Sequence, residues 1–484
     1  MRSKRLFTNS HRCHYIAGVN TEAAHSISAD DPATRPSQAI GLTEALKVWA
    51  RIGWLSFGGP AGQIALMHRE LVEQRRWISE SRFLHALNYC MLLPGPEAQQ
   101  LATYIGWLLH RTWGGIAAGA LFVLPGCLSM LLLSWLYVSY HGVAAIGVVF
   151  FGLKAAVLAI VVSAVLRIGS RALKNRFMIG IAATAFIALY VFHISFPLVV
   201  LGAALIGLIA KDRVVASSHG SASQAEDEAE YLVDRMHANG ELAHAQPSTR
   251  RAIMVTVVSL ALWFAPVAAI ALWLGTKHVL VKEGVMFSQT AVVTFGGAYA
   301  VLAYVAQRTV EHLHWLQPGE MIDGLALAET TPGPLIMVLQ FVGFLAAHRF
   351  AEPLNPWVAA TLGALLTTWV TFLPSFLFIF LGAPYMESLR RNQSLNAALS
   401  CVTAAVVGVI LNLSVWFATH TLFGQVMRVD VGPLRLDVPE WATIEPGAIL
   451  LSVAAFIGLR RYKLGMLWVL LYCVLGGAIY WWLR

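Results

Sequence analysis

A helix-breaking phrase occurs twice in this chain at a fixed distance. The residues Ser-Phe-Gly-Gly at 56–59 return as Thr-Phe-Gly-Gly at 294–297, which is 238 positions later. At the same offset, the Pro-Gly-Pro at 94–96 falls on an identical tripeptide at 332–334. Chance rarely aligns two such breaks in one register. We therefore infer an internal duplication, which is typical of transporters built from two repeats.

Other residues support the duplication and show where the two halves differ in length. Trp77 falls on Trp315 at the offset of 238. Further on, the Leu-Pro pair at 124–125 matches the pair at 373–374, so the offset has become 249. The second half therefore carries eleven extra residues, which we place near 351–356.

The composition indicates a membrane protein. The chain is 57% hydrophobic and 12% charged, against about 25% charged residues in soluble proteins. Most of the apolar segments approach the ~20 residues that cross a bilayer as a helix. We predict an all-α polytopic integral membrane protein of about thirteen transmembrane helices, in two antiparallel, inverted-topology repeats broken at the Phe-Gly-Gly and Pro-Gly-Pro motifs. The predicted segments are 41–67, 84–109, 115–138, 143–166, 177–192, 194–210, 253–275, 285–305, 321–347, 357–381, 397–420, 447–459 and 464–483.

Polar stretches define the expected domains. Residues 1–40 form a polar tail without an apolar segment, so we expect no cleavable signal peptide. Residues 41–210 form the first repeat, 211–251 a solvated linker, and 252–484 the second repeat. The net charge of +8 is spread over short loops, which indicates a polytopic protein rather than one that binds nucleic acid.

Loop charges predict the orientation of the chain in a bacterial inner membrane. Basic residues gather on the side of the N-terminus, which the positive-inside rule makes cytoplasmic together with the linker. The C-terminus is then periplasmic. One loop disagrees, because Arg69, Arg75, Arg76 and Arg82 fall on the outer side in this scheme. Either neighbouring glutamates offset these charges, or the segment 84–109 does not cross the membrane simply.

The paired breaks suggest where a substrate binds. Proline and glycine interrupt a helix, and bare backbone in lipid costs several kcal/mol per unsatisfied group. Each break starts a new half-helix, near Ala61, Glu97, Ala298 and Leu335. Helix N-termini offer free N–H groups and about +0.5 charge each, so four of them would suit an oxyanion. The alternative is that the breaks are kinks required for packing.

Charged and polar side chains within apolar segments complete the predicted site. Arg51 and Lys154 are candidates to offset the substrate's charge, although Arg51 could also extend to the membrane surface. Glu97 and Glu329 are candidates for proton coupling, whereas Glu320 and Asp323 are interpreted as interfacial charges. The residues predicted to bind substrate are Arg51, Ser56, Phe57, Gly58, Gly59, Pro60, Pro94, Gly95, Pro96, Gln100, Lys154, Thr294, Phe295, Gly296, Gly297, Thr331, Pro332, Gly333 and Pro334.

Motifs of enzymes and metal sites are missing from the sequence. There is no GxxxxGK[ST] loop for nucleotide, no HExxH, no GxSxG and no spaced carboxylate pair. We therefore predict a carrier without catalytic residues, resident metal or cofactor.

The same motifs resemble those of the chromate ion transporter family. The likeness is carried by the phrases at 56–60, 93–100 and 124–126, and by their second-half copies at 295–297 and 331–334. It covers about residues 41–483 and matches the long, two-domain members. The resemblance implies a plasma-membrane antiporter of about thirteen helices that exports chromate, is driven by the proton-motive force and confers chromate resistance.

Two questions stay open from the residues alone. Chromate and sulfate are tetrahedral dianions of similar size, so an uptake permease for sulfate or a related oxyanion is the alternative. The residues do not determine the direction of transport. The expected partners are the oxyanion and the lipid bilayer, with a homodimer left open and nucleic acid excluded.

Overall fold

The computed structural model describes residues 40–140, 142–210, 231–238, 246–295, 297–386, 393–431 and 434–483. The predicted N-terminal tail up to residue 39, most of the linker, and Gly296 of the second Phe-Gly-Gly motif lie outside these residues.

The first half opens with short helices separated at the two predicted breaks. The Phe-Gly-Gly motif divides the segment 41–67 into two helices, and the Pro-Gly-Pro divides the segment 84–109 in the same way. The last helix of the group bends sharply where His110 and Arg111 leave helical geometry. The elements are α1 (Leu42–Leu55), α2 (Gly59–His68), the π-helix η2 (Arg69–Gln74), α3 (Glu80–Cys90) and α4 (Glu97–Tyr140).

The second half repeats this order with matching local geometry. Both π-helices begin at the same offset of 238, at Arg69 and at Gln307. The left-handed residue Arg76 also has its match in His314, with φ angles of 53° and 51°. The elements are α11 (Val279–Val293), α12 (Ala298–Ala306), the π-helix η5 (Gln307–His312), α13 (Pro318–Thr330), the short 3₁₀ helix η6 (Leu335–Met337), α14 (Val338–Arg349) and α15 (Pro356–Gly382).

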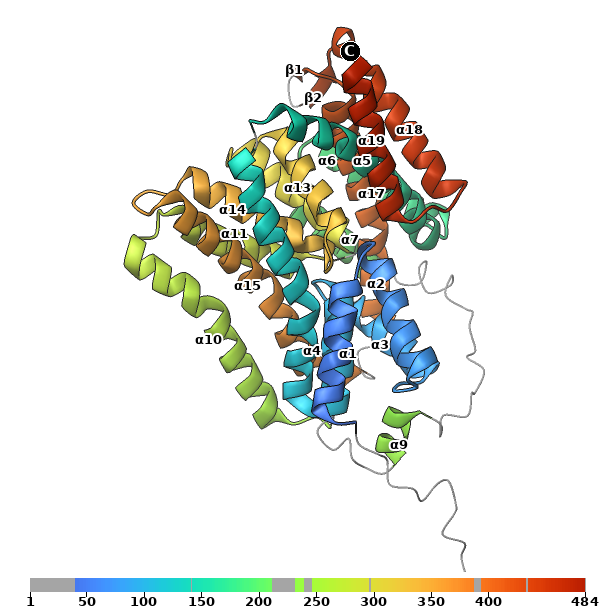
Figure 1. Ribbon diagram of the computed structural model, residues 1–484. Coiled ribbons are helices and arrows are strands. Elements are labelled where there is room, and N and C mark those ends of the chain that lie inside the picture. Colours follow the sequence, from blue (N-terminus) through green and yellow to red (C-terminus); the bar gives the residue numbers. More distant parts are fainter. Residues whose placement is uncertain are drawn as a thin grey trace, which may run out of the picture. The chain divides into compact units, whose positions relative to one another are not determined.

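The remaining helices surround these two groups. In Figure 1, α10 runs beside α15, and the pair α18 and α19 packs on α5. Helix α17 lies against α5, α6 and α7. The elements are α5 (Ala144–Ala172), α6 (Arg176–Tyr190), α7 (Phe196–Ile209), α9 (Leu232–Ala238), α10 (Thr249–Leu274), η7 (Ala383–Tyr385), α17 (Gln393–Leu422), η8 (Trp441–Thr443), α18 (Pro446–Arg460) and α19 (Met466–Leu483).

One small sheet interrupts the helical architecture. Strands β1 (Val426–Val431) and β2 (Leu434–Pro439) pair antiparallel, with Val426 opposite Pro439. The hairpin lies between α17 and α18, in a stretch that sequence analysis left outside the helices. The chain is otherwise helical in the residues that the structure describes.

Two long matched helices run in opposite directions. The start of the long part of α4 lies against the end of α15, where Gly115 contacts the ring of Phe380. At the other end, Trp135 of α4 meets Trp357 at the start of α15, with ring centroids 4.2 Å apart. We call the end near Gly115 the linker face and the end near Trp135 the opposite face.

Six of the described helices are long and apolar enough to cross a membrane, and four more apolar helices are shorter. The six are α4, α5, α10, α15 with its short 3₁₀ extension, α17 and α19. Together they make this a multi-pass membrane protein. The number of about thirteen crossings stays a prediction.

A contact from the linker settles the position of the basic loop. The N–H of Leu232 in α9 donates to the carbonyl of Arg76 at 3.2 Å, and the N–H of Val233 donates to that of Trp77 at 3.0 Å. The loop therefore lies on the same side as α9, whereas the orientation inferred from loop charges placed it on the other side. Helices α1 and α2 form a hairpin that returns the chain toward α9, with Arg51 of α1 3.7 Å from Glu70 just after α2.

Candidate functional site

Glycines at the breaks adopt a backbone conformation that other residues avoid. The φ angles are 88° at Gly58, 68° at Gly59, 121° at Gly95, 97° at Gly297 and 96° at Gly333. Left-handed geometry costs most side chains about 1–2 kcal/mol, whereas glycine adopts it freely. The breaks are thus built into the sequence at the residues that sequence analysis selected.

Each Pro-Gly-Pro loop is bonded to the other half of the protein. The N–H of Gly333 donates to the carbonyl of Ser56 at 2.8 Å, and the N–H of Gly95 donates to that of Thr294 at 2.9 Å. Both carbonyls belong to residues at which a helix ends. The two bonds satisfy backbone groups that the broken helices expose, as a membrane interior requires.

Four helix starts meet at one small cavity. Its walls come from the first turns of α2, α4 and α12 and from η6, which continues into α14. The space open to the centre of a water-sized sphere is about 20 Å³, which suits roughly one water. A tetrahedral oxyanion is larger, so its entry requires these helix starts to separate. The lining residues are Pro60, Gln63, Pro96, Glu97, Ala98, Gly297, Ala298, Pro334, Leu335 and Ile336.

The residues that line the cavity include one carboxyl group, that of Glu97, and no basic side chain. The first N–H groups of a helix have no partner within it, and each helix start carries about half a positive charge. Four helix starts therefore supply about two positive charges, which balance the charge of a dianion without a basic side chain. Glu97 is half-buried at the wall, where its carboxylate would repel an anion.

Two glutamine side chains donate hydrogen bonds to the backbone of the Pro-Gly-Pro loops. Gln100 Nε2 donates to the carbonyl of Pro94 at 2.7 Å, within the first Pro-Gly-Pro loop. Gln63 Nε2 donates to the carbonyl of Gly333 at 2.6 Å and so joins α2 to the second loop. Sequence analysis predicted Gln100 but missed Gln63. The available signal was a polar residue one turn after Pro60 in an apolar segment.

Several predicted hydroxyl groups bond to their own helices. Ser56 Oγ donates to the carbonyl of Ile52, and Thr294 Oγ1 donates to that of Thr290. Thr331 Oγ1 donates in the same way to Ala328. These hydroxyl groups hold the helix ends beside the breaks. Phe57, Phe295 and Pro332 lie in the same break segments outside the cavity wall, and Pro94 and Gly95 form the loop behind it.

The two predicted cationic residues lie away from the cavity. The side chain of Arg51 is 57% exposed and lies 3.7 Å from the buried carboxylate of Glu70. Lys154 Nζ lies 3.2 Å from Asp323 Oδ1, and Tyr137 donates to the other oxygen of that carboxylate at 2.9 Å. The structure therefore brings neither cation to the predicted anion site.

Two second-half carboxylates are buried rather than interfacial. Asp323 is 4% exposed and pairs with Lys154, and Glu320 is 6% exposed and pairs with Arg349. Sequence analysis interpreted both as interfacial charges; in the structure α13 packs against α5 and α14, and both side chains are buried in ion pairs. Glu329 is also buried and accepts a hydrogen bond from Tyr299 at 2.8 Å.

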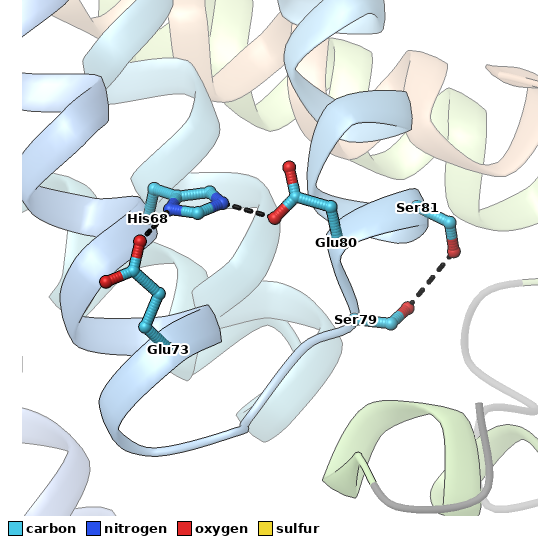
Figure 2. Close-up of polar contacts among 5 residues, drawn as sticks. All are labelled: His68, Glu73, Ser79, Glu80 and Ser81. Atoms are coloured by element: carbon cyan, nitrogen blue, oxygen red, sulfur yellow. Dashed lines mark hydrogen bonds and ion pairs between the residues drawn. The ribbon is translucent and has the colours of Figure 1, made fainter. Parts of the chain in front are cut away.

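The end of α2 farthest from the cavity is tied to its neighbours by a charged cluster. Figure 2 shows the imidazole of His68 between the carboxylates of Glu73 and Glu80, with the Glu73 contact at 3.0 Å. Each ring nitrogen faces a carboxylate oxygen of a different glutamate. The cluster fixes α2 to the start of α3.

Comparison with known proteins gives consistent matches. The model of a family described as chromate transporter matches residues 43–208 and 282–481. A chromate transport protein of Pseudomonas aeruginosa is 34% identical over 79% of this chain and 85% of its own length. A chromate transport protein of Cupriavidus metallidurans is 27% identical over 87% of this chain and 94% of its own. No solved structure matches this one significantly.

Proposed function

This chain belongs to the chromate transporter family, and from that premise we propose that it exports chromate from the cytoplasm and confers chromate resistance. The observation that carries the proposal is the meeting of four helix starts at one cavity inside a multi-pass membrane protein. Chromate is a dianion, and the half-charges of four helix starts sum to about two positive charges.

The two halves supply a route for alternating access. The long part of α4 and its match α15 run in opposite directions, and each half bonds to a break in the other. We infer two inverted repeats, with a linker face toward the cytoplasm and the C-terminus on the periplasmic side. The stacking of Phe151, near the start of α5, on Tyr480, near the end of α19, supports a C-terminus at the opposite face. Rocking of one repeat against the other would open the cavity to each face in turn.

Glu97 is the residue of the cavity wall that would bind and release a proton during transport. An ionised Glu97 would repel chromate, so a bound dianion favours the protonated carboxyl group, and the coupling is reciprocal. This linkage favours movement of chromate and a proton in the same direction, which argues against the antiport implied by the family resemblance. The pair still carries one negative charge outward, which an inside-negative potential favours by about 2.3 kcal/mol per 100 mV. The electrical part of the proton-motive force then drives export.

The direct test measures labelled chromate in everted membrane vesicles energised with a respiratory substrate. We expect energy-dependent accumulation in vesicles that contain the protein, and its collapse when the membrane potential is dissipated. Vesicles that carry a Gly95→Ala variant provide a matched background, since this glycine has φ 121° in the first loop. Accumulation no greater than in vesicles without the protein would overturn the proposal.

Sulfate enters this test as a competitor. The comparisons give no support to sulfate uptake, but backbone donors recognise the shape and charge that the two dianions share. We expect excess sulfate to reduce chromate accumulation. Labelled sulfate that accumulates in intact cells, instead of chromate in everted vesicles, would favour the alternative of an uptake permease.

A further inference from the structure

A line of buried polar groups with no hydrogen-bond partner runs along α15. Thr367, Thr371 and Ser375 are 0%, 2% and 1% exposed, and their hydroxyl groups have no partner among the described residues. They follow one another at intervals of four residues, which places them on one ridge of the helix. We call these three residues the hydroxyl ridge.

The ridge hydroxyl groups differ in their bonding from the other two hydroxyl groups of the same helix. Two other threonines of α15, Thr361 and Thr368, donate to carbonyls four residues earlier, at 2.8 and 2.9 Å. Buried hydroxyl groups in membrane helices normally form such bonds, because an unpaired polar group costs about 1–3 kcal/mol. The ridge groups therefore keep both donor and acceptor capacity available inside the protein.

A buried carboxyl group stands at one end of the ridge. Glu283 of α11 is 0% exposed, and neither carboxyl oxygen has a hydrogen-bond partner among the described residues. The carboxyl group reaches α15 beside Gly363, where a Cβ would lie 2.8 Å from Oε2. Gly363 precedes Thr367 by four residues, so Glu283 continues the line of the ridge.

No charge neutralises Glu283 from the elements packed against it. Helix α15 contains no ionisable residue, and α10 carries only Arg250 and Arg251, at its distant start. On α14 the nearest basic groups are His348 and Arg349, and Arg349 is bonded to Glu320. On α11 itself, His278 accepts from the N–H of Leu280, and Lys282 is exposed. An unpaired buried carboxyl group is stable only with its proton.

The other end of the ridge reaches the first Pro-Gly-Pro loop, whose last residue, Pro96, lines the cavity. A Cβ on Gly95 would lie 2.7 Å from Ser375 Oγ and 2.8 Å from Gln100 Nε2, so both side chains border the first Pro-Gly-Pro loop. Gln100 uses its Nε2 for Pro94 and leaves Oε1 without a partner. Glu97 lies one turn before Gln100 in α4 and lines the cavity.

We propose that Glu283 and the hydroxyl ridge form a proton pathway between the opposite face and Glu97 at the cavity. The proposal rests on the proposed function, and it identifies the residues along which the proton of Glu97 would leave the cavity. Glu283 lies in the second turn of α11, near the opposite face. From Gly363 to Ser375 the ridge spans about 18 Å along the helix axis, in steps of about 6 Å. One water between successive hydroxyl groups would complete the chain.

The transfer needs no other reactant. Protonated Glu283 first releases its proton to solution at the opposite face. The O–H bond of Glu97 then breaks, each ridge hydroxyl accepts a proton on a lone pair and releases its own, and the carboxylate of Glu283 accepts the last proton. Once the dianion has dissociated at the opposite face, the ionised Glu97 repels it and prevents it from binding again, so the exit of the proton is coupled to the net exit of chromate.

The test separates net transport from exchange in liposomes that contain the full-length protein and an internal pH dye. Net flux of chromate requires Glu97 to lose and regain its proton, whereas exchange of labelled for unlabelled chromate does not. We expect Glu283→Gln and Thr371→Val to reduce net chromate flux and its proton signal by about a hundredfold, the usual scale for a lost proton-transfer group. Exchange should be unchanged in both variants.

Thr361→Val is the matched control, because this hydroxyl lies on the same helix and bonds to its own backbone. It should leave both net flux and exchange as in the wild-type protein. Valine matches the shape of threonine, so Thr371→Val should also leave thermal stability unchanged or raise it. Normal net flux in both ridge variants would overturn the proposal, and so would loss of exchange together with net flux.

A second measurement does not depend on chromate. The infrared band of a protonated carboxyl group should diminish in Glu283→Gln and shift when the pH outside the opposite face is raised. If the wild-type protein exchanges no chromate, the proposed function fails, and this band still reports on Glu283. An unchanged band in Glu283→Gln would overturn the pathway alone.

Discussion

The N–H of Gly333 donates to the carbonyl of Ser56 across 2.8 Å and joins the second Pro-Gly-Pro loop to the first Phe-Gly-Gly break. The bond from Gly95 to Thr294 is its counterpart at the same offset of 238. The carbonyl group at each Phe-Gly-Gly break thus receives its hydrogen bond from the other half of the protein. The cavity between them exists only when both halves are folded together.

Gly333→Ala tests how much this junction depends on glycine. Gly333 has a φ angle of 96°, and an added Cβ would lie 3.1 Å from the Cα of Gly126. We expect a loss of about 1–3 kcal/mol in the free energy of unfolding, because alanine is strained in this conformation. The thermal unfolding midpoint of the purified protein measures the change.

Gly180→Ala provides the comparison for that variant. Gly180 lies inside α6, and a Cβ there meets nothing within 4 Å. Alanine in a helix interior is favoured over glycine by about 0.5–1 kcal/mol, so this control should hold or raise the midpoint. Equal midpoints for the two variants would show that the left-handed geometry at Gly333 is not required.

Glu97→Gln tests the link between proton and anion at the cavity. Glutamine imitates the protonated carboxyl group, so we expect chromate binding to persist and to lose its dependence on pH. Net transport should fall by about a hundredfold, since no proton can be exchanged at this position. Equilibrium binding of labelled chromate to purified protein over a range of pH provides the measurement.

Glu352→Gln serves as the control for Glu97→Gln, because Glu352 is exposed in the turn between α14 and α15. Its chromate binding should follow the pH dependence of the wild-type protein. Should Glu97→Gln also retain that dependence, the titrating group is elsewhere.

Lys154→Ala separates charge compensation from a structural ion pair. Removing the lysine leaves the 4% exposed carboxylate of Asp323 without its partner at 3.2 Å. Breaking a buried pair costs about 3 kcal/mol, and less here because Lys154 is itself 26% exposed. We expect a lower yield of folded protein per cell. We also expect lower transport, measured both per cell and per folded molecule.

The double variant Lys154→Ala with Asp323→Asn distinguishes the two roles. If the lysine only balances Asp323, the second change should restore folding and export together. Restored folding without export would support the predicted role of Lys154 in compensating the substrate's charge. Arg51→Ala should cost no more than about 1 kcal/mol of stability, because Arg51 is itself exposed and Arg75 also lies 3.6 Å from the carboxylate of Glu70.

Cysteine labelling tests the sides of the membrane on which we propose that these loops lie. The basic loop meets the linker helix α9, so Arg76→Cys and Ser248→Cys should react from one face and Glu352→Cys from the other. All three positions are exposed, and the four native cysteines in the described residues are buried. A membrane-impermeant maleimide applied to intact cells and to everted vesicles gives the result. Reaction of Arg76→Cys and Glu352→Cys from the same face would contradict the arrangement.

The sequence by itself determined the breaks and their pairing. Glycine and proline act through local backbone geometry, so the motifs at 56–60 and 94–96 could be recognised wherever the chain placed them. An exact offset of 238 then related the two halves, and the match of Arg76 with His314 shows that local conformation follows the same register. The half-helix starts near Glu97 and Ala298 were predictable for this reason.

Only the tertiary structure decided which side chains meet. Lys154 pairs with Asp323 from a helix far along the chain, and Glu283 reaches Gly363 of α15, contacts that no spacing within one segment encodes. The segment 41–67 has the length and apolarity of a span, yet it folds as a hairpin because its break is stabilised by Gly333 of the other half. The period of a sequence pattern shows which face of its own helix a residue occupies. Its burial and its pairing depend on the other helices that pack against that face.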